Sequence, residues 1–148
     1  MSAQRMSIKD VDSAAYTAVL ALQKYVNNGG LDKKLVALVD IRASQINHCA
    51  WCLDMHVTEA REAGATQRQV DLVAAWHEAP ELYTEREQAA LALAEQVTLI
   101  SEDGVSDDVW ARVRAAFDER ETVVLLMAIS VINVWNRMNV TVRTALPE

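Results

Sequence analysis

Both cysteines of the chain and two of its three histidines lie within one eleven-residue stretch, INHCAWCLDMH, at residues 46–56. If residues 48–63 form a helix, Cys49, Cys52 and His56 occupy positions i, i+3 and i+7 and therefore share one face. Two thiols and an imidazole on one helix face are compatible with three kinds of site. These are a metal site, a redox-active dithiol, and a packed core in which the thiols are inert.

The distance between the outer residues argues against a metal site. Seven residues of helix separate Cys49 from His56 by about 10 Å along the axis, whereas a tetrahedral zinc needs each ligand atom at about 2.0 to 2.3 Å. His48 points from a different side of the helix, and His77 is the only other histidine. The sequence has no second CxxC or HxxxH motif. We therefore expect no metal ion, and we identify no cofactor-binding residue.

A redox site needs fewer groups. Two cysteines separated by two residues at the first turn of a helix can form a disulfide, and the free N–H groups of that turn stabilise a thiolate. Proximity to the helix start favours Cys49 as the more acidic thiol. His56 lies four residues beyond Cys52 and can take its proton directly or through one water, which favours Cys52 as the nucleophile. We follow the histidine, and two inert buried thiols beside a core histidine remain the alternative.

The composition predicts the kind of fold that must position this cluster. The chain has 148 residues, of which 51% are hydrophobic, with only four glycines and two prolines. This length is sufficient for a buried core, and the composition is poor in helix breakers. No strand pattern, linker or repeat interrupts the helical periodicity. We expect an all-α, single-domain bundle of about seven helices that spans residues 1–148.

Start and stop signals divide the chain into seven helical segments. The first three follow Ser13, Asp32 and Asn47, and Asn47 is expected to be the N-cap of the segment that carries the cysteines. The later segments begin at capping signals, namely Thr66 with Gln69, Thr84 with Glu87, Ser106, and Asp118 with Glu121.

The last segment, residues 121–146, is apolar around its circumference. This pattern predicts a central core helix, or a helix that also lies in a subunit interface. Asn133, Asn136 and Arg137 are polar residues within one turn of this helix, and polar groups at such positions need hydrogen-bond partners.

Charge and hydropathy argue against two classes of partner. The net charge is −7, with 14 Lys and Arg residues scattered among 21 acidic ones, so we expect no nucleic-acid binding. The sequence starts without an apolar signal core and contains no run of about 18 uninterrupted apolar residues. We therefore expect a cytoplasmic protein that does not bind a membrane. In that reducing compartment, two close cysteines are more often catalytic or metal-binding than structural.

The sequence resembles the alkylhydroperoxidase D-like proteins of the carboxymuconolactone decarboxylase superfamily. The resemblance is carried by IRASQINHCAWCLDMHVTEAREAG, with LYTEREQAALALAEQVTLI and AISVINVWNRMNV downstream, and covers most of residues 15–143. It implies an all-α fold, a homo-oligomer that is dimer-based, trimeric or hexameric, and thiol-dependent reduction of a peroxide substrate as antioxidant defence.

The same resemblance implies a role for each residue of the cluster. Cys52 attacks the peroxide and becomes a sulfenic acid, and Cys49 condenses with it to form a disulfide. An external dithiol donor of the thioredoxin type then reduces the disulfide. His56 is the implied member of the proton relay.

Two positions depart from the pattern of the family. The relay glutamate that is usual twelve residues before the first cysteine is replaced by Ala37. Asp40 lies about one turn further along the same helix and is a candidate substitute through a water. His48 stands where relatives commonly have glycine, and it is either a replacement proton carrier or an exposed residue at the helix start. The departure at Ala37 predicts weak peroxidase activity.

Two other functions compete with the peroxidase. The first is a lyase of the carboxymuconolactone decarboxylase type, which needs a pocket for an anionic lactone but no pair of cysteines. The second is a non-catalytic, redox-responsive oligomeric protein in which the disulfide alters packing without peroxide turnover. The missing carboxylate at the Ala37 position favours the second of these.

Overall fold

The computed structural model describes residues 3–147, and within them the chain forms nine α-helices, two 3₁₀ helices and no strand. The α-helices are α1 (Ile8–Val11), α2 (Ser13–Asn27), α3 (Lys33–Ile46), α4 (Ala50–Glu62), α5 (Gln67–Leu72), α6 (Glu85–Thr98), α7 (Ile100–Asp103), α8 (Asp107–Ala116) and α9 (Glu119–Val142). The 3₁₀ helices are η1 (Val73–Glu78) and η2 (Pro80–Leu82). The all-α prediction is confirmed, and the seven expected helices correspond to α2 to α6, α8 and α9.

Side-chain caps begin most of these helices where the sequence predicts them. Complete capping boxes are present at Thr66, Thr84 and Asp118, and single caps at Asp32 and Ser106. In each case a side-chain oxygen accepts a backbone N–H that the helix leaves without a partner. The first long helix differs by one residue, because Asp12 is its N-cap and Ser13 is already helical.

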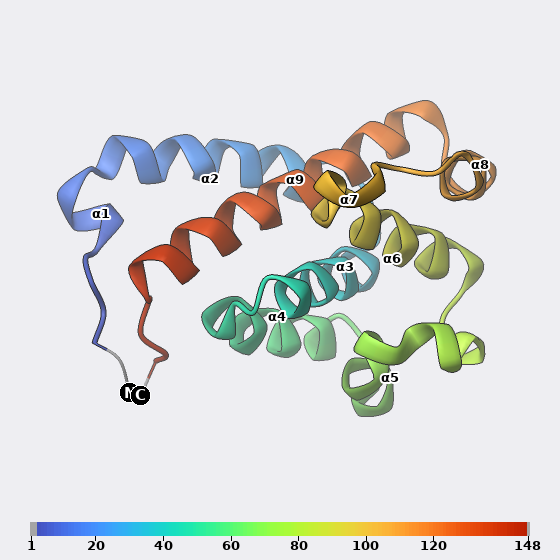
Figure 1. The fold of residues 1–148 in the computed structure, drawn as a ribbon, viewed down its shortest axis with the longest axis horizontal. Coiled ribbons are helices and arrows are strands. Elements are labelled where there is room, and N and C mark those ends of the chain that lie inside the picture. Colours follow the sequence, from blue (N-terminus) through green and yellow to red (C-terminus); the bar gives the residue numbers. More distant parts are fainter. Residues whose placement is uncertain (1–2, 148) are drawn as a thin grey trace.

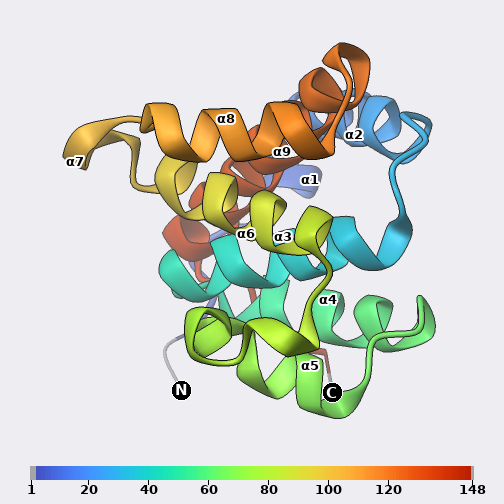
Figure 2. The same cartoon turned by 90° about the vertical axis from the view of Figure 1, so that its right-hand side faces the viewer.

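The helices pack in layers around α3. Figure 2 shows α8, α6, α3 and α4 stacked in that order, and these neighbours are in contact along the stack. Two groups of buried apolar side chains fill the layers, one including Leu38, Ile41, Trp76 and Leu91 and the other Val39, Leu93, Leu125 and Ile129. Because α3 is buried between α4 and α6, side chains that project from it are fixed in position.

The long helix α9 crosses one side of this stack, and α2 lies along it (Figure 1). By length and composition α9 could cross a membrane, but it packs against α2, α3 and α6 and buries nine of its residues in the chain. It also leaves Val123, Leu126 and Val140 exposed. Part of the apolar surface of α9 is therefore buried in the core. The exposed apolar side chains are compatible with a subunit interface, which stays a prediction.

The polar residues of α9 have the partners that the sequence demands. Asn136 is fully buried and donates from Nδ2 to Ser44 Oγ at 2.9 Å. Asn133 donates to Thr98 Oγ1 at 3.0 Å, and Arg137 donates to Asn133 Oδ1 at 2.8 Å. These bonds connect α9 to α3 and α6 and fix the rotation of α9 about its own axis.

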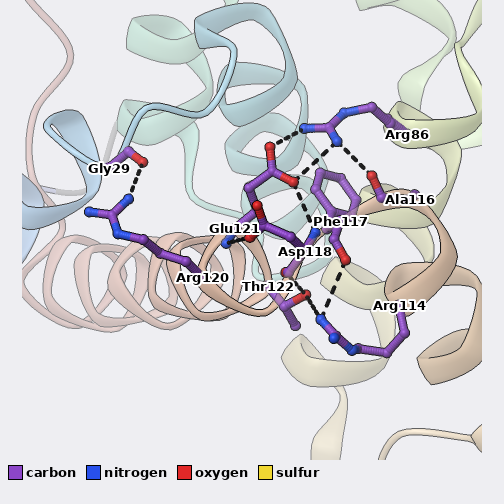
Figure 3. Close-up of polar contacts among 9 residues, drawn as sticks. All are labelled: Gly29, Arg86, Arg114, Ala116, Phe117, Asp118, Arg120, Glu121 and Thr122. Atoms are coloured by element: carbon purple, nitrogen blue, oxygen red, sulfur yellow. Dashed lines mark hydrogen bonds and ion pairs between the residues drawn. The ribbon is translucent and has the colours of Figure 1, made fainter.

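Arginine side chains anchor the start of α9 to three other parts of the chain (Figure 3). Arg86 of α6 pairs with Glu121 at 3.1 Å and also covers the ring of Phe117. Arg114 of α8 donates to Thr122 Oγ1 at 2.8 Å, and Arg120 donates to the carbonyl oxygen of Gly29, in the loop between α2 and α3, at 3.2 Å. The start of α9 is therefore held against α6, α8 and the loop before α3.

Candidate functional site

The two cysteines form a disulfide at the start of α4. The Cα atoms of Cys49 and Cys52 are 5.3 Å apart, and both residues are about 1% exposed. Ala43 of α3 and Ile132 of α9 are buried with them, and Trp51 and Trp135 pack against this group. The CxxC pair thus lies where α3, α4 and α9 meet, in a buried group flanked by two tryptophans.

The predicted N-cap of the cysteine helix, Asn47, is wrong. Asn47 is instead the C-cap of α3, and its side chain donates to Asn133 and Asn136 of α9 at 2.9 Å. The chain then turns through His48, whose φ of 56° is left-handed, and Cys49 becomes the N-cap of α4. The Asn47 side chain therefore bonds to α9 and is not used to cap α4.

The new cap places one sulfur atom at the end of the helix. Cys49 Sγ accepts the backbone N–H of Cys52 at 3.3 Å. This N–H belongs to the first turn of α4, where partial positive charge accumulates. If reduction preserves this contact, the N–H would favour a thiolate on Cys49, as the helix-end argument predicts.

His56 faces two carboxylates through one ring nitrogen. Its Nδ1 lies 2.8 Å from Oε2 of Glu59 on α4 and 3.6 Å from Oδ2 of Asp40 on α3. The pKa of Glu59 is lowered, so its carboxylate is an acceptor and Nδ1 carries the proton that faces it. Nε2 is buried and has no hydrogen-bond partner among residues 3–147. In the neutral imidazole this Nε2 is the free base.

Burial controls the ionisation of Asp40. Desolvation raises the pKa of the Asp40 carboxyl to about 7, and the neighbouring charge of His56 offsets only part of this shift. Near neutral pH, Asp40 is consequently present in both its protonated and its ionised form. A carboxyl group of this kind can exchange a proton with the imidazole that it faces.

Opposing causes act on His56 and Glu59. Burial lowers the pKa of His56, but the hydrogen bond to Glu59 and the charge of Asp40 raise it by more, so the net direction is upward from 6.5. The hydrogen bond to His56 lowers the pKa of Glu59. The Glu59 side chain is 51% exposed, whereas that of Asp40 is 9% exposed. The three groups therefore form a chain that runs from a buried carboxyl to one at the surface.

The carboxylates and His56 lie on the wall of a cavity of about 640 Å³. The cavity lies among α2, α3, α4 and α9, and its lining includes the aromatic side chains of Tyr16, Trp51 and Trp135. The two tryptophans also pack against the cysteine group. A small organic molecule in this cavity would contact the imidazole and the two tryptophans that pack against the cysteine group.

The structure brings together some of the residues that the sequence singles out and not others. Asp40 does approach His56, and Ala37 lines the same cavity without any group that could carry a proton. His48 is exposed at the turn between α3 and α4, and within residues 3–147 no hydrogen bond or ion pair connects its side chain to His56 or to either cysteine. His77 pairs with Glu95 at 2.9 Å, away from this cluster.

Two residues of the site were missed by sequence reasoning. Glu59 lies three residues beyond His56 on one helix, and this spacing alone predicts a contact between the two side chains. Asn139 of α9 donates from Nδ2 to Cys52 Sγ at 3.8 Å across 87 positions of the sequence. No local signal indicates the contact of Asn139, because it depends on how α9 packs on α4.

The donor set of the cluster fits thiol chemistry and proton transfer. Within residues 3–147, no group of three or more His, Cys, Asp or Glu side chains is arranged to hold a metal ion. The dithiol can supply two electrons, and the Asp40, His56 and Glu59 side chains can move protons near neutral pH.

The chain resembles known proteins along most of its length. The carboxymuconolactone decarboxylase family matches residues 13–96. The chain is 36% identical over 137 residues to the uncharacterized protein YdfG of Bacillus subtilis (strain 168), covering 93% of this chain and 92% of that protein.

Solved structures share the fold. A protein of unknown function from Agrobacterium tumefaciens, for which the role of the antioxidant defence protein AhpD has been suggested, superposes with a TM-score of 0.95 at 40% identity and covers 99% of both chains. The debrominase Bmp8 shares the fold alone, with a TM-score of 0.77 and 17% identity over 88% of this chain and 70% of that one.

Proposed function

The chain belongs to the carboxymuconolactone decarboxylase family, and we propose that it is a thiol-dependent peroxidase that reduces hydrogen peroxide or an alkyl hydroperoxide. The observation that carries the proposal is the Cys49–Cys52 disulfide at the start of α4, the same helix that carries His56, which faces two carboxylates. Its relative from Agrobacterium tumefaciens, suggested to be an antioxidant defence protein, supports the same class of function.

In the first step, the reduced Cys52 thiolate attacks the terminal oxygen of the peroxide. The S–O bond forms as the O–O bond breaks, and the leaving oxygen takes a proton to give an alcohol or water. His56 supplies a base for the thiol proton and then an acid for the leaving oxygen, through its free Nε2. Cys52 is left as a sulfenic acid.

In the second step, Cys49 attacks the sulfur of the sulfenic acid. The S–S bond forms, and the hydroxyl group leaves with a proton as water. The two electrons that reduce the peroxide thus come from the dithiol, and an external dithiol protein of the thioredoxin type must restore them. The backbone N–H of Cys52 favours the thiolate form of Cys49 for this attack.

Asp40 and Glu59 take the place of the missing carboxylate at Ala37. Asp40 comes from the same helix as Ala37 and faces His56 from the buried side, while Glu59 faces it from the exposed side. We propose that this pair returns the proton of His56 to solvent after each turnover. The protein is further expected to act as a cytoplasmic homo-oligomer.

Mass spectrometry of the intact protein tests this function. The reduced protein is mixed with one equivalent of cumene hydroperoxide or hydrogen peroxide, and the expected product has lost two hydrogens. Cys52→Ser should not form this product, and the Cys49→Ser/Cys52→Ser double variant is the matched control for oxidation elsewhere. Thiols that stay reduced after prolonged exposure would contradict the proposal.

The same variants separate the competing functions. Turnover of a muconolactone by the double serine variant would favour the lyase, because that reaction needs no thiol. Oxidation of the wild-type protein without turnover under any reducing system, together with a change in oligomer size, would favour the redox-responsive protein. The peroxidase requires repeated consumption of peroxide with a dithiol donor.

A further inference from the structure

The sulfur of Cys52 receives its hydrogen bond from a different part of the chain than that of Cys49. Asn139 of α9 donates to Cys52 Sγ from Nδ2 at 3.8 Å, while Cys49 Sγ accepts the backbone N–H of Cys52. Within residues 3–147, Asn139 is the only side chain that is hydrogen-bonded to either sulfur. Each sulfur therefore accepts a hydrogen bond from a different donor, a backbone N–H for Cys49 and a side-chain amide for Cys52.

The contacts of Asn139 determine which end of its amide faces the sulfur. Oδ1 accepts the hydroxyl of Thr144 at 2.7 Å, and Nδ2 donates to the carbonyl oxygen of Trp135 at 3.0 Å. A flipped amide would place Oδ1 against the Trp135 carbonyl oxygen, so that two acceptors would face one another. The NH₂ group is thus directed to Cys52, with one hydrogen for Trp135 and the other for the sulfur.

The end of α9 holds this amide in place. Arg143 adopts a left-handed conformation with φ of 55° as the C-cap, and the Thr144 N–H then bonds to the Asn139 carbonyl oxygen at 3.0 Å. This turn brings the Thr144 hydroxyl back onto the Asn139 side chain. The helix end therefore fixes the rotamer of Asn139 before the sulfur changes its charge.

The surroundings of Cys52 are apolar, so a hydrogen-bond donor there affects the ionisation of its thiol. Cys52 is about 1% exposed and is packed with Ala43 and Ile132, and apolar burial disfavours a thiolate. A neutral thiol accepts a hydrogen bond weakly, whereas an anionic sulfur accepts one strongly. The amide consequently stabilises the reactive form of Cys52 more than its resting form.

We propose that Asn139 is a catalytic hydrogen-bond donor to Cys52, which stabilises the thiolate that attacks the peroxide and the anionic form of the sulfenic acid that follows. The ionisation step transfers the thiol proton to His56 and leaves the negative charge on Sγ, against the Asn139 amide. This inference rests on the proposed function for its choice of Cys52 as the attacking thiol. The effect on thiol ionisation, however, is measured without any peroxide.

The experiment starts from the Cys49→Ser protein, in which Cys52 is the only thiol. Its thiolate is titrated by ultraviolet absorbance, alone and combined with Asn139→Asp or Asn139→Leu. Asp keeps an oxygen for Thr144 and replaces the donor by an acceptor, and Leu removes the donor at similar volume. We expect the Cys52 midpoint to rise by about one pH unit or more in both variants, with about tenfold slower oxidation by cumene hydroperoxide below the parent midpoint.

A matched control comes from the same helix. Asn133→Leu removes an amide that bonds to Thr98, Asn47, Arg137 and a backbone carbonyl but not to sulfur, so its Cys52 midpoint should equal that of the parent. The titratable groups near Cys52, which are His56, Asp40 and Glu59, and the α9 cations Arg137 and Arg143 are retained in every variant.

Two results test the role of Asn139 and the peroxidase function separately. A folded Asn139→Asp protein, checked by circular dichroism, whose Cys52 midpoint equals that of the parent overturns the role of Asn139. A shifted midpoint supports that role even if no peroxide oxidises the wild-type protein, and in that case the proposed peroxidase function fails by itself.

Discussion

Glu59 Oε2 lies 2.8 Å from Nδ1 of His56, about one turn further along α4. Because the Glu59 side chain is half exposed and Asp40 is buried, His56 stands between a carboxylate in contact with solvent and one that is not. The proposed proton path therefore has an outlet to water through Glu59, whereas the Ala37 position is buried.

Removing the charge of Glu59 should lower the pKa of His56. In Glu59→Gln the imidazolium loses the negative charge that helps to raise its pKa, and its hydrogen bond then goes to a neutral amide oxygen, while the burial that lowers the pKa remains. Proton NMR titration of the three imidazole rings, assigned with His48→Gln and His77→Gln, measures the change. Glu62→Gln removes the same charge from α4 at a residue that lines the cavity but does not bond to His56, so an equal shift there would contradict the assignment.

Asp40→Asn should flatten the pH dependence of stability. The folded pKa of Asp40, about 7, lies above its ordinary 3.8, so between these values the folded state keeps a proton that the unfolded state has released. The free energy of unfolding of the wild-type protein therefore falls as pH rises through this window, and the fall is complete above pH 7. His56 acts in the same direction, because the stabilisation from its raised pKa is lost as pH rises through the folded value.

Urea unfolding of the oxidised proteins measures this effect. The free energy of unfolding of Asp40→Asn, taken relative to that of wild type, should increase by roughly 2–4 kcal/mol as pH rises from about 4 to about 8. Asp54→Asn, a substitution at an exposed aspartate of α4, should follow the wild-type curve. Parallel curves for wild type and Asp40→Asn would show that the carboxyl ionises as it does in the unfolded chain.

Cys49→Ser should arrest the reaction after the first step. Without the resolving thiol, Cys52 is oxidised to a sulfenic acid that cannot close to a disulfide. One equivalent of peroxide is consumed, and repeated turnover with a dithiol donor is lost. Dimedone, which adds to sulfenic acids, should label Cys52 after peroxide treatment, as seen in the mass of the tryptic peptide. Labelling of Cys49 in Cys52→Ser at an equal rate would contradict this assignment of the two roles, and a faster rate would reverse it.

Asn136→Leu should destabilise the protein by about 2–3 kcal/mol, because it leaves the buried hydroxyl of Ser44 on α3 without its partner and removes one of the two acceptors of Asn47. Asn136 donates to Ser44 and accepts from Asn47, and neither contact can be replaced by a leucine. Urea unfolding measures the loss. Adding Ser44→Ala should recover part of it by removing one orphaned hydroxyl, and a loss that is the same with or without Ser44→Ala would contradict this account.

The helix boundaries were largely predictable because their signals are local. The capping boxes at Thr66, Thr84 and Asp118 involve residues three positions apart, and each is present. Asn47 misled the prediction for the opposite reason. Its side chain bonds to Asn133 and Asn136, 86 and 89 positions away, and this long-range contact is not visible in the neighbouring sequence.

The candidate site divides in the same way. The shared face of Cys49, Cys52 and His56 follows from helical spacing, and Glu59 could have been found by the same rule. Asn139 reaches Cys52 only through the packing of α9 on α4. The exposure of Glu59 and the burial of Asp40 likewise depend on how α3 and α4 pack, so the ionisation of the relay could not be read from the sequence.

Trp51 and Trp135, two of the four tryptophans, pack against the buried group that contains the disulfide. A disulfide in contact with an excited indole accepts an electron from it and quenches its fluorescence. Reduction of the Cys49–Cys52 bond should therefore brighten the emission of this protein, and reoxidation should dim it. Tryptophan emission should thus report the redox state of the Cys49–Cys52 pair in real time without a label.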